Sequence, residues 1–416
     1  MALGYLDGNF LFGTTYGCFV YLGVGYNFTE PQKMIDLRKS NNSNPHFETL
    51  TTVKAKTVIS SSFYFENNLI LADWQGNIWC LNLNTQAKVW ETNIKKPVLF
   101  EFIFYNQKLY AFNENTFFEI DISTGNITEI FNFIVIGSVV QEKNKIYLNE
   151  RNKKGPNTTG KILEIDLNNF TVECIKEENI KSTFGQLTRI EILANEQEVF
   201  FYCDKAIHKY NVATQTTEMI YENSNIEFRI QGIFKVDTSL MFIPGMKNPK
   251  AGTANYPINP NLFSVFIKEQ FSEAKPIDET IISSTISFKG NSVKINDKES
   301  VTTYGGYLFF SNNSNIKIVE ITDRKITGQD GFLYKNKNEI YLLEPTSFYD
   351  KEKEQGFKLY KIANQTITLL EEFTTNKLGN NYREPDFDFF DDKIVVRCDG
   401  QAYLLKKLQL TRVYLR

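Results

Sequence analysis

Histidine is the scarcest functional residue type in this chain of 416 residues, which contains only His46 and His208. Histidine is the side chain most often used as a general base near neutral pH and is the commonest metal ligand. No GxSxG motif is present to indicate a serine hydrolase. His46 lies in a polar segment, and the strand-like alternation around His208 predicts that this side chain points outward. The sequence therefore gives little support to hydrolytic or zinc chemistry.

Cysteine is also sparse and irregularly placed. The five cysteines are far apart, odd in number and form neither a CxxC motif nor a Cys/His cluster. This spacing argues against both a disulfide framework and a zinc site. We therefore expect small, buried strand residues at these positions. The cysteines are Cys18, Cys80, Cys174, Cys203 and Cys398.

Long apolar runs are missing as well, and no stretch of about 18 apolar residues predicts a membrane-spanning helix. The first residues lack the basic and apolar regions of a signal peptide and read directly as a strand. These features predict a soluble, cytoplasmic protein, with a removed leader as the alternative.

Charge is nearly balanced, at a formal net value of -3 with a pI near 5.8. Basic residues are scattered rather than gathered into a stripe. This distribution argues against a nucleic-acid surface and against binding to an anionic membrane.

A degenerate repeat of β-patterned runs and turns fills most of the chain. In the clearest unit, residues 68–90, two short strands flank a turn at 75–77, and a second turn follows at 84–87. Polar residues that end the third strand of each unit recur at intervals of about 40 to 57 residues, which is the spacing of β-propeller blades. These residues are Asn82, Asp121, Asp166, Asn211, Lys268, Glu320, Lys361 and Lys406.

We predict an all-β fold: a single β-propeller domain over residues 1–416, built from four-stranded antiparallel blades. Eight blades are favoured, with seven as the alternative. A partial repeat at residues 9–23 predicts that strands from the N- and C-terminal ends complete one blade together, because such a closure leaves no open seam. Residues 27–47 are predicted to form an irregular connection.

The turn residues of the two clearest units resemble PQQ-type propeller repeats, which are related to quinoprotein and WD40-like propellers. In this pattern a short polar side chain binds turn amides, Gly supplies a positive φ and Trp packs between neighbouring sheets. Later units keep part of the turn, but Glu129, Cys174 and Met219 replace the Trp. The matching residues are Asn82, Thr85, Gln86 and Trp90, then Asp121, Thr124 and Gly125.

Quinoprotein dehydrogenases among these relatives hold their cofactor with stacking Trp residues and a vicinal disulfide. This chain has three Trp residues, all in one unit, and no adjacent cysteines. The resemblance therefore implies a non-enzymatic member with no cofactor. Fold similarity alone does not select its function.

The densest acidic cluster lies near the C-terminus, where Asp386 and Asp388 alternate with Phe. Alternation places both carboxylates on one face of a strand, where they are weak candidates for calcium binding or acid/base chemistry. The alternative is a strand that runs into a solvated Asp-Asp turn.

Three long polar insertions fall between the second and third strands of their units, at residues 150–160, 244–261 and 344–356. This connection lies on the same face of every propeller blade, and long loops on a rigid scaffold often carry binding sites. Aromatic residues with polar surroundings resemble a protein-recognition surface. We therefore predict partner contacts by Lys153, Met246, Lys247, Tyr256, Phe348 and Tyr349.

The sequence thus favours a non-enzymatic propeller that binds another protein through its loop-bearing face, as a scaffold or as a neutralising partner such as an immunity protein against a bacterial toxin. The alternative is an enzyme or a carbohydrate-binding propeller that uses a central funnel. A periplasmic assembly factor is a third possibility, which requires a leader or a lipid anchor.

Overall fold

A computed structural model shows an all-β protein, in which every element of the described residues is a strand. No helix in this part of the chain is long and apolar enough to span a membrane. The structure describes residues 2–6, 9–13, 18–22, 27–33, 47–55, 57–151, 158–180, 192–203, 206–222, 228–236, 239–246, 261–266, 274–278, 292–296, 298–304, 307–312, 315–320, 331–336, 339–345, 356–374, 386–390, 393–398 and 401–407.

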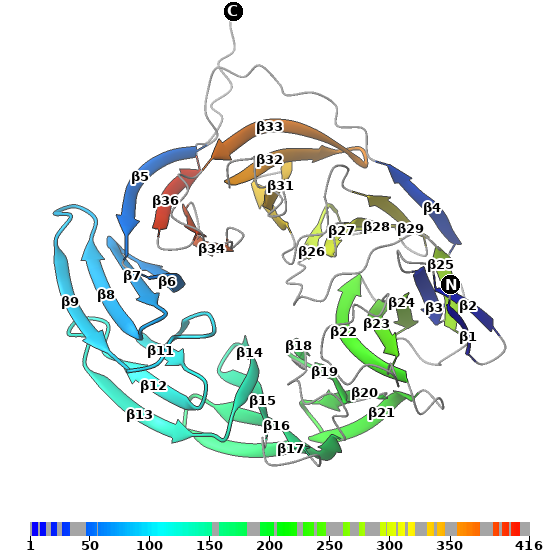
Figure 1. The fold of residues 1–416 in the computed structure, drawn as a ribbon, viewed down its shortest axis with the longest axis horizontal. Coiled ribbons are helices and arrows are strands. Elements are labelled where there is room, and N and C mark those ends of the chain that lie inside the picture. Colours follow the sequence, from blue (N-terminus) through cyan, green and yellow to red (C-terminus); the bar gives the residue numbers. More distant parts are fainter. Residues whose placement is uncertain are drawn as a thin grey trace, which may run out of the picture. The chain divides into compact units, whose positions relative to one another are not determined.

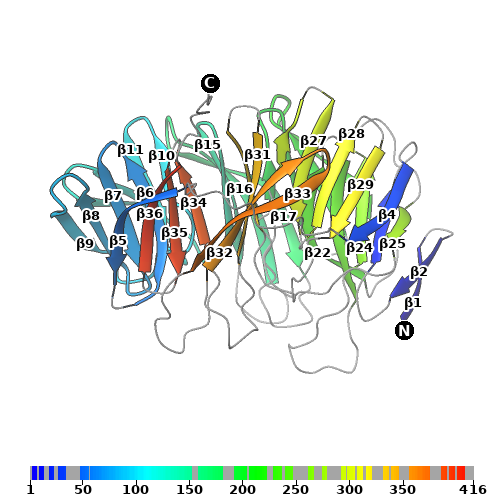
Figure 2. The same cartoon turned by 90° about the horizontal axis from the view of Figure 1, so that it is seen from above.

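The chain forms two compact units, and each is described by itself. The first comprises residues 1–34 and 133–333, and the second comprises 35–132 and 334–416, so that β30 straddles the boundary. Each unit is a succession of twisted sheets packed on one another, as in the blades of a β-propeller. Figures 1 and 2 show the strands of single blades, such as β6 to β9, running side by side in chain order.

The second unit contains four blades of four strands each. Their strands, in spatial order, are β6 (Ile59–Phe65), β7 (Asn68–Asp73), β8 (Asn77–Asn82) and β9 (Lys88–Asn93); β10 (Ile103–Tyr105), β11 (Lys108–Phe112), β12 (Thr116–Ile120) and β13 (Ile127–Asn132); β30 (Phe332–Asn336), β31 (Glu339–Pro345), β32 (Gly356–Ala363) and β33 (Thr366–Thr374); and β34 (Asp386–Phe390), β35 (Lys393–Cys398), β36 (Gln401–Lys407) and β5 (Phe47–Lys54).

The first unit contains two four-stranded blades, two five-stranded sheets and a separate hairpin. The blades are β14 (Ile136–Glu142), β15 (Lys145–Arg151), β16 (Thr158–Asp166) and β17 (Thr171–Ile180), then β18 (Ile192–Ala194), β19 (Glu198–Cys203), β20 (Ala206–Asn211) and β21 (Thr216–Glu222). The five-stranded sheets are β22 (Phe228–Val236), β23 (Ser239–Met246), β24 (Asn261–Phe266), β3 (Cys18–Leu22) and β25 (Ala274–Asp278), then β26 (Ser292–Lys294), β27 (Glu299–Tyr304), β28 (Tyr307–Asn312), β29 (Asn315–Glu320) and β4 (Asn27–Lys33). The hairpin pairs β1 (Ala2–Leu6) with β2 (Asn9–Gly13).

The predicted number of blades is wrong: six four-stranded antiparallel blades form in the described residues, not eight or seven. The two remaining sheets have five strands because segments from the N-terminal region join them in parallel. β3 pairs in parallel with β24, and β4 pairs in parallel with β29. A repeat read along the sequence does not reveal strands that are inserted from elsewhere.

Two predictions for the N-terminal region are corrected by the same pairing. Strands from both ends of the chain do complete one blade, but the N-terminal strand is β5, which pairs with β36, rather than residues 9–23. The segment 27–47 is not wholly irregular, because it contains β4 and the start of β5. Phe47 begins β5, and the residues between the two strands lie outside the described set.

All six four-stranded blades share an irregularity that the sequence did not reveal. In each, the register shifts between the third and fourth strands, at positions such as Cys80/Leu81 and Ile207/His208. A β-bulge of this kind bends the strand and increases its right-handed twist. The repeated bulge therefore bends the outer strand in each of these six blades.

The predicted turn chemistry is present between the third and fourth strands. The Asn82 Oδ1 atom accepts hydrogen bonds from the backbone N–H groups of Asn84 and Thr85, at 3.1 and 3.0 Å. Asp121 Oδ1 accepts equivalent bonds from Ser123 and Thr124, both at 2.9 Å. These bonds hold the turn closed, as expected for Asx turns.

Trp90 packs against the neighbouring blade, as the repeat pattern predicted. Its indole Nε1 donates a hydrogen bond to the Ile122 carbonyl oxygen at 2.9 Å, and its ring covers Gly125. A Cβ atom added at Gly125 would lie 2.5 Å from Trp90 Cε3. The absence of a side chain at Gly125 is therefore what allows the ring to dock.

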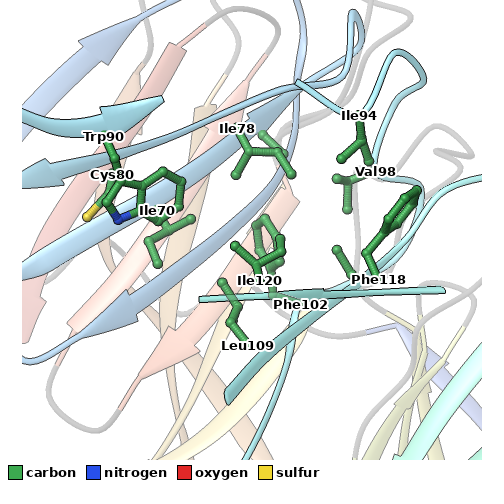
Figure 3. Close-up of a cluster of buried hydrophobic side chains, with 12 residues drawn as sticks. Ile70, Ile78, Cys80, Trp90, Ile94, Val98, Phe102, Leu109, Phe118 and Ile120 are labelled. Carbon is green, nitrogen blue, oxygen red and sulfur yellow. The ribbon is translucent and has the colours of Figure 1, made fainter. Parts of the chain in front are cut away.

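Around this contact, the facing sides of two blades form one continuous apolar core. Ile70, Ile78 and Cys80 of one blade pack with Leu109 and Ile120 of the next. Figure 3 shows these side chains between the two sheets. Burial of such aliphatic side chains contributes about 1.5–3 kcal/mol each. Contact between successive blades thus buries apolar side chains of both sheets and stabilises this part of the unit.

The cysteine prediction holds at two of the three cysteines whose side chains the structure describes. Cys80 and Cys203 are buried, whereas Cys174 is exposed on β17. None of these three cysteines forms a disulfide bond. The fourth strand is the outermost of its blade, so a side chain there reaches solvent more readily than one in the middle strands.

Candidate protein-binding surface

We define the loop face as the end of each blade at which the second and third strands connect. Residues 152–157 connect β15 to β16, residues 247–260 connect β23 to β24, and residues 346–355 connect β31 to β32. The predicted insertions therefore stand between second and third strands. The predicted partner residues Lys153, Lys247, Tyr256, Phe348 and Tyr349 lie outside the described residues, and Met246 ends β23 without a described side chain.

The best described part of the loop face is the short turn between β7 and β8. Buried Asp73 organises it, because its Oδ1 accepts hydrogen bonds from the N–H groups of Gln75 and Asn77 at 2.9 and 3.0 Å. Asp73 Oδ2 accepts a third bond from the Asn77 side-chain amide at 2.9 Å. The Trp74 N–H donates to the Val58 carbonyl oxygen at 3.0 Å. The turn is therefore fixed at both ends.

A second segment, which connects β9 to β10, packs directly on this turn. The Ile94 N–H donates to the Gly76 carbonyl oxygen at 3.0 Å. Gly76 has a φ of +81°, and a Cβ atom there would lie 2.6 Å from the Lys96 carbonyl oxygen. Glycine is thus required at this position both by the backbone angle and by the close approach of the two segments.

The same connecting segment is tied to the next blade. The Leu99 N–H donates to the Phe112 carbonyl oxygen, and Lys96 Nζ donates to Asn115 Oδ1, both at 3.0 Å. Asn113 closes the β11–β12 turn, since its Oδ1 accepts bonds from the N–H groups of Asn115 and Thr116. Three segments from two blades therefore form one continuous, hydrogen-bonded surface.

This surface carries exposed apolar side chains. Trp74 is 43% exposed and Leu99 is 36% exposed, whereas the other two Trp residues, Trp79 and Trp90, are each 8% exposed. Lys95 and Lys96, whose backbone packs against Gly76 of this turn, are also exposed. We call Trp74, Lys95, Lys96 and Leu99 the Trp74 patch.

A buried ion pair joins the loop-face end of the blade formed by β34, β35, β36 and β5 to the blade that carries Trp74. Arg397 Nε lies 2.7 Å from Asp388 Oδ2, and Arg397 Nη2 lies 3.2 Å from Asp388 Oδ1. Both side chains are buried. Arg397 Nη1 also donates to the Ser60 carbonyl oxygen of β6 at 2.6 Å, and the Ser62 hydroxyl donates to Asp388. The pair therefore connects β34 and β35 to the neighbouring blade.

This ion pair involves one of the two weak candidates for metal binding, Asp386 and Asp388. The carboxylate of Asp388 serves as the partner of Arg397, and the two residues share a strand, β34, as the alternation predicted. The side chain of Asp386 is outside the described set. Among the residues that the structure describes, no group of three or more His, Cys, Asp and Glu side chains is placed to hold a metal ion.

The predicted orientation of His208 is wrong. His208 is buried and stacks on Phe201, with ring centroids 5.4 Å apart. It lies on β20, the third strand of its blade, and middle strands of stacked sheets are covered on both faces. His46 lies outside the described residues.

The positions that lack the docking Trp are exposed. Glu129, Cys174 and Met219 all face solvent on the fourth strands of their blades. The repeat pattern does not single out Trp74, because all three Trp residues lie in the same well-preserved repeat. Its position directly after the strand-ending Asp73, in a turn, is the signal that separates it from them.

No protein-family model matches the sequence, and no curated protein is significantly similar to it. Solved structures are similar in fold. The computationally designed Ika8 protein has a TM-score of 0.52 and 12% identity, with 85% of this chain and 97% of that chain covered. The C-terminal WD40 domain of Sif2 has a TM-score of 0.51 and 10% identity, with 87% and 99% covered. WD40 repeats form β-propellers, and the fold of this chain is therefore that of a β-propeller.

Proposed function

We propose that this protein is a non-enzymatic scaffold that binds another protein through its loop face. A neutralising role, such as that of an immunity protein against a bacterial toxin, is the specific form that we favour. A diverged, non-enzymatic PQQ-like repeat and a cytoplasmic location are parts of the same proposal. The solved WD40 domain supports the propeller fold but does not select a function.

The observation that carries the proposal is the exposure of Trp74 on a fixed turn. Energetically dominant residues of protein interfaces are enriched in Trp, and they work best on surfaces that do not need to be ordered on binding. The bonds from Asp73 already fix the backbone on both sides of Trp74. Trp74 is therefore suited to anchor a partner at low entropic cost.

The test compares two single substitutions of exposed apolar residues. Trp74→Ser removes the anchor, whereas Val89→Ser alters a side chain that is 52% exposed on the outer strand β9. The partner is first isolated with the unmodified full chain and identified by mass spectrometry, and its affinity for each variant is then measured with purified proteins.

We expect Trp74→Ser to weaken the affinity at least about 30-fold, which corresponds to an interface residue worth about 2 kcal/mol. Val89→Ser should leave the affinity unchanged. Equal affinities for both variants and the unmodified chain would contradict the proposed role of the loop face.

A further inference from the structure

Several connections at the loop face contain two lysines each, although the short turns at residues 74–76 and 113–115 contain none. The segment between β9 and β10 carries Lys95 and Lys96, both exposed. In the sequence, the insertion between β15 and β16 contains Lys153 and Lys154, and the one between β23 and β24 contains Lys247 and Lys250. The insertion between β31 and β32 differs, with two Lys and three acidic residues among residues 346–355.

The opposite ends of the blades show a different composition. Four described turns between third and fourth strands contain neither Lys nor Arg, namely residues 83–87, 122–126, 167–170 and 212–215. Two of these turns follow Asp121 and Asp166. Since the whole chain has a formal net charge of -3, the lysine pairs are a local departure from its balance.

The two lysines of the Trp74 patch are positioned for an external anion. The Lys96 ammonium donates to the neutral amide oxygen of Asn115 at 3.0 Å, so that bond does not neutralise its charge. Glu101 and Glu114, which lie on the same connections, are each engaged in an interaction within the protein. The backbone of Lys95 is held by a bond of 2.6 Å from its N–H to Asn93 Oδ1.

We infer that the partner of the Trp74 patch is an acidic protein segment that places an aromatic or aliphatic side chain on Trp74 and carboxylates beside Lys95 and Lys96. This inference rests on the proposed function and adds the chemistry of the partner to it. Complementary charge at the edge of an interface mainly increases the association rate and selects among partners. The apolar pair Trp74 and Leu99 supplies the contact area, and the lysines supply the preference for acidic segments.

The test uses Trp74 as its own reporter, because the other two Trp residues are buried. The unmodified full chain is titrated with a random copolymer of glutamate and tyrosine, and quenching of Trp fluorescence by acrylamide is followed. Polyglutamate, a random copolymer of lysine and tyrosine, and an oligothymidylate are the comparison probes. We expect the glutamate–tyrosine copolymer to bind most tightly and to protect Trp74 from the quencher.

The double substitution Lys95→Glu and Lys96→Glu should weaken this binding about tenfold or more and reduce its dependence on salt. The control, Lys88→Glu with Lys143→Glu, changes the net charge equally at exposed positions on the outer strand β9 and in the β14–β15 turn. It should bind like the unmodified chain. Circular dichroism of both variants checks that the fold is retained.

Equal binding of the lysine–tyrosine copolymer, or no effect of the Lys95 and Lys96 substitutions, would overturn the inference. Tighter binding of the oligothymidylate than of the acidic copolymer would overturn it as well, by assigning the lysines to nucleic acid. None of these results contradicts the proposed function, provided that binding of the isolated partner still requires Trp74. If binding of the isolated partner does not require Trp74, both the inference and the proposed function are overturned.

Discussion

The contact between Trp90 and Gly125 allows a quantitative prediction about what holds successive blades together. The position four residues after the turn-initiating Asn or Asp has a positive φ in each of four blades. It is occupied by Gln86, Gly125, Phe170 and Gln215, with φ values of 53°, 74°, 56° and 53°. Three of these four residues have side chains. A positive φ alone therefore does not require glycine, and the docked ring of Trp90 is the remaining cause.

We predict that Gly125→Ala lowers the free energy of unfolding by about 2–5 kcal/mol. About 1–2 kcal/mol of this arises from a side chain in the left-handed region. A further 1–3 kcal/mol, roughly, arises from overpacking against the indole, since the new Cβ would otherwise lie 2.5 Å from Trp90 Cε3. Trp90→Ala alone should cost about 3–5 kcal/mol, as is usual for a buried Trp.

The double variant separates the two causes. With Trp90 replaced by Ala, the overpacking disappears, and Gly125→Ala should then cost only the backbone penalty of about 1–2 kcal/mol. The coupling between the two sites is therefore expected to be about 1–3 kcal/mol, measured by urea unfolding of all four proteins in a double-mutant cycle. Identical costs of Gly125→Ala in both backgrounds would refute the argument that the ring requires glycine.

Three further predictions follow from the buried and titratable groups. Arg397→Met leaves the Asp388 carboxylate buried without its ionic partner. The free energy of unfolding, measured with urea, should therefore fall by about 3–5 kcal/mol. A decrease of less than about 1 kcal/mol would contradict this prediction. Hydrogen bonds from a serine hydroxyl and from backbone amides of its turn lower the pKa of Asp121 in the folded protein. The ionised carboxylate therefore stabilises the fold at pH values above the pKa of the unfolded chain. This stabilisation is lost as the pH falls through the lower pKa of the folded state. Asp121→Asn should therefore flatten the acid limb of the stability profile, and an unchanged limb would argue against it. Burial raises the pKa of Cys80 to about 11, whereas Cys174 is exposed. Iodoacetamide at pH 8 should therefore modify Cys174 well before Cys80, which peptide mass mapping measures. Equal rates of modification would contradict the burial of Cys80.

The fold class was predictable because its signals are local. Alternating apolar runs and Asx turns at Asn82 and Asp121 depend on neighbouring residues, and the hydrogen bonds in both turns match the expectation. The docking of Trp90 followed from the same repeat. The number of blades was not predictable, since β3 and β4 join sheets formed by residues more than 200 positions away.

The environments of the candidate site residues were harder to predict from the sequence than the fold class. The outward orientation predicted for His208 assumed a strand with one solvated face, whereas a middle strand between stacked blades has none. Asp388 was read together with its sequence neighbour Asp386, but its ionic partner, Arg397, lies on the adjacent strand. The pairing of strands decides both environments, and a single sequence does not contain it.

The central claim is that a partner protein covers the Trp74 patch. Hydroxyl-radical footprinting of the full chain, alone and with its isolated partner, tests this most directly, because Trp74 and Val89 are both exposed in the free protein. We expect the partner to slow the oxidation of Trp74 strongly and to leave the oxidation of Val89 unchanged. Oxidation of Trp74 at the same rate in the complex as in the free protein would contradict it.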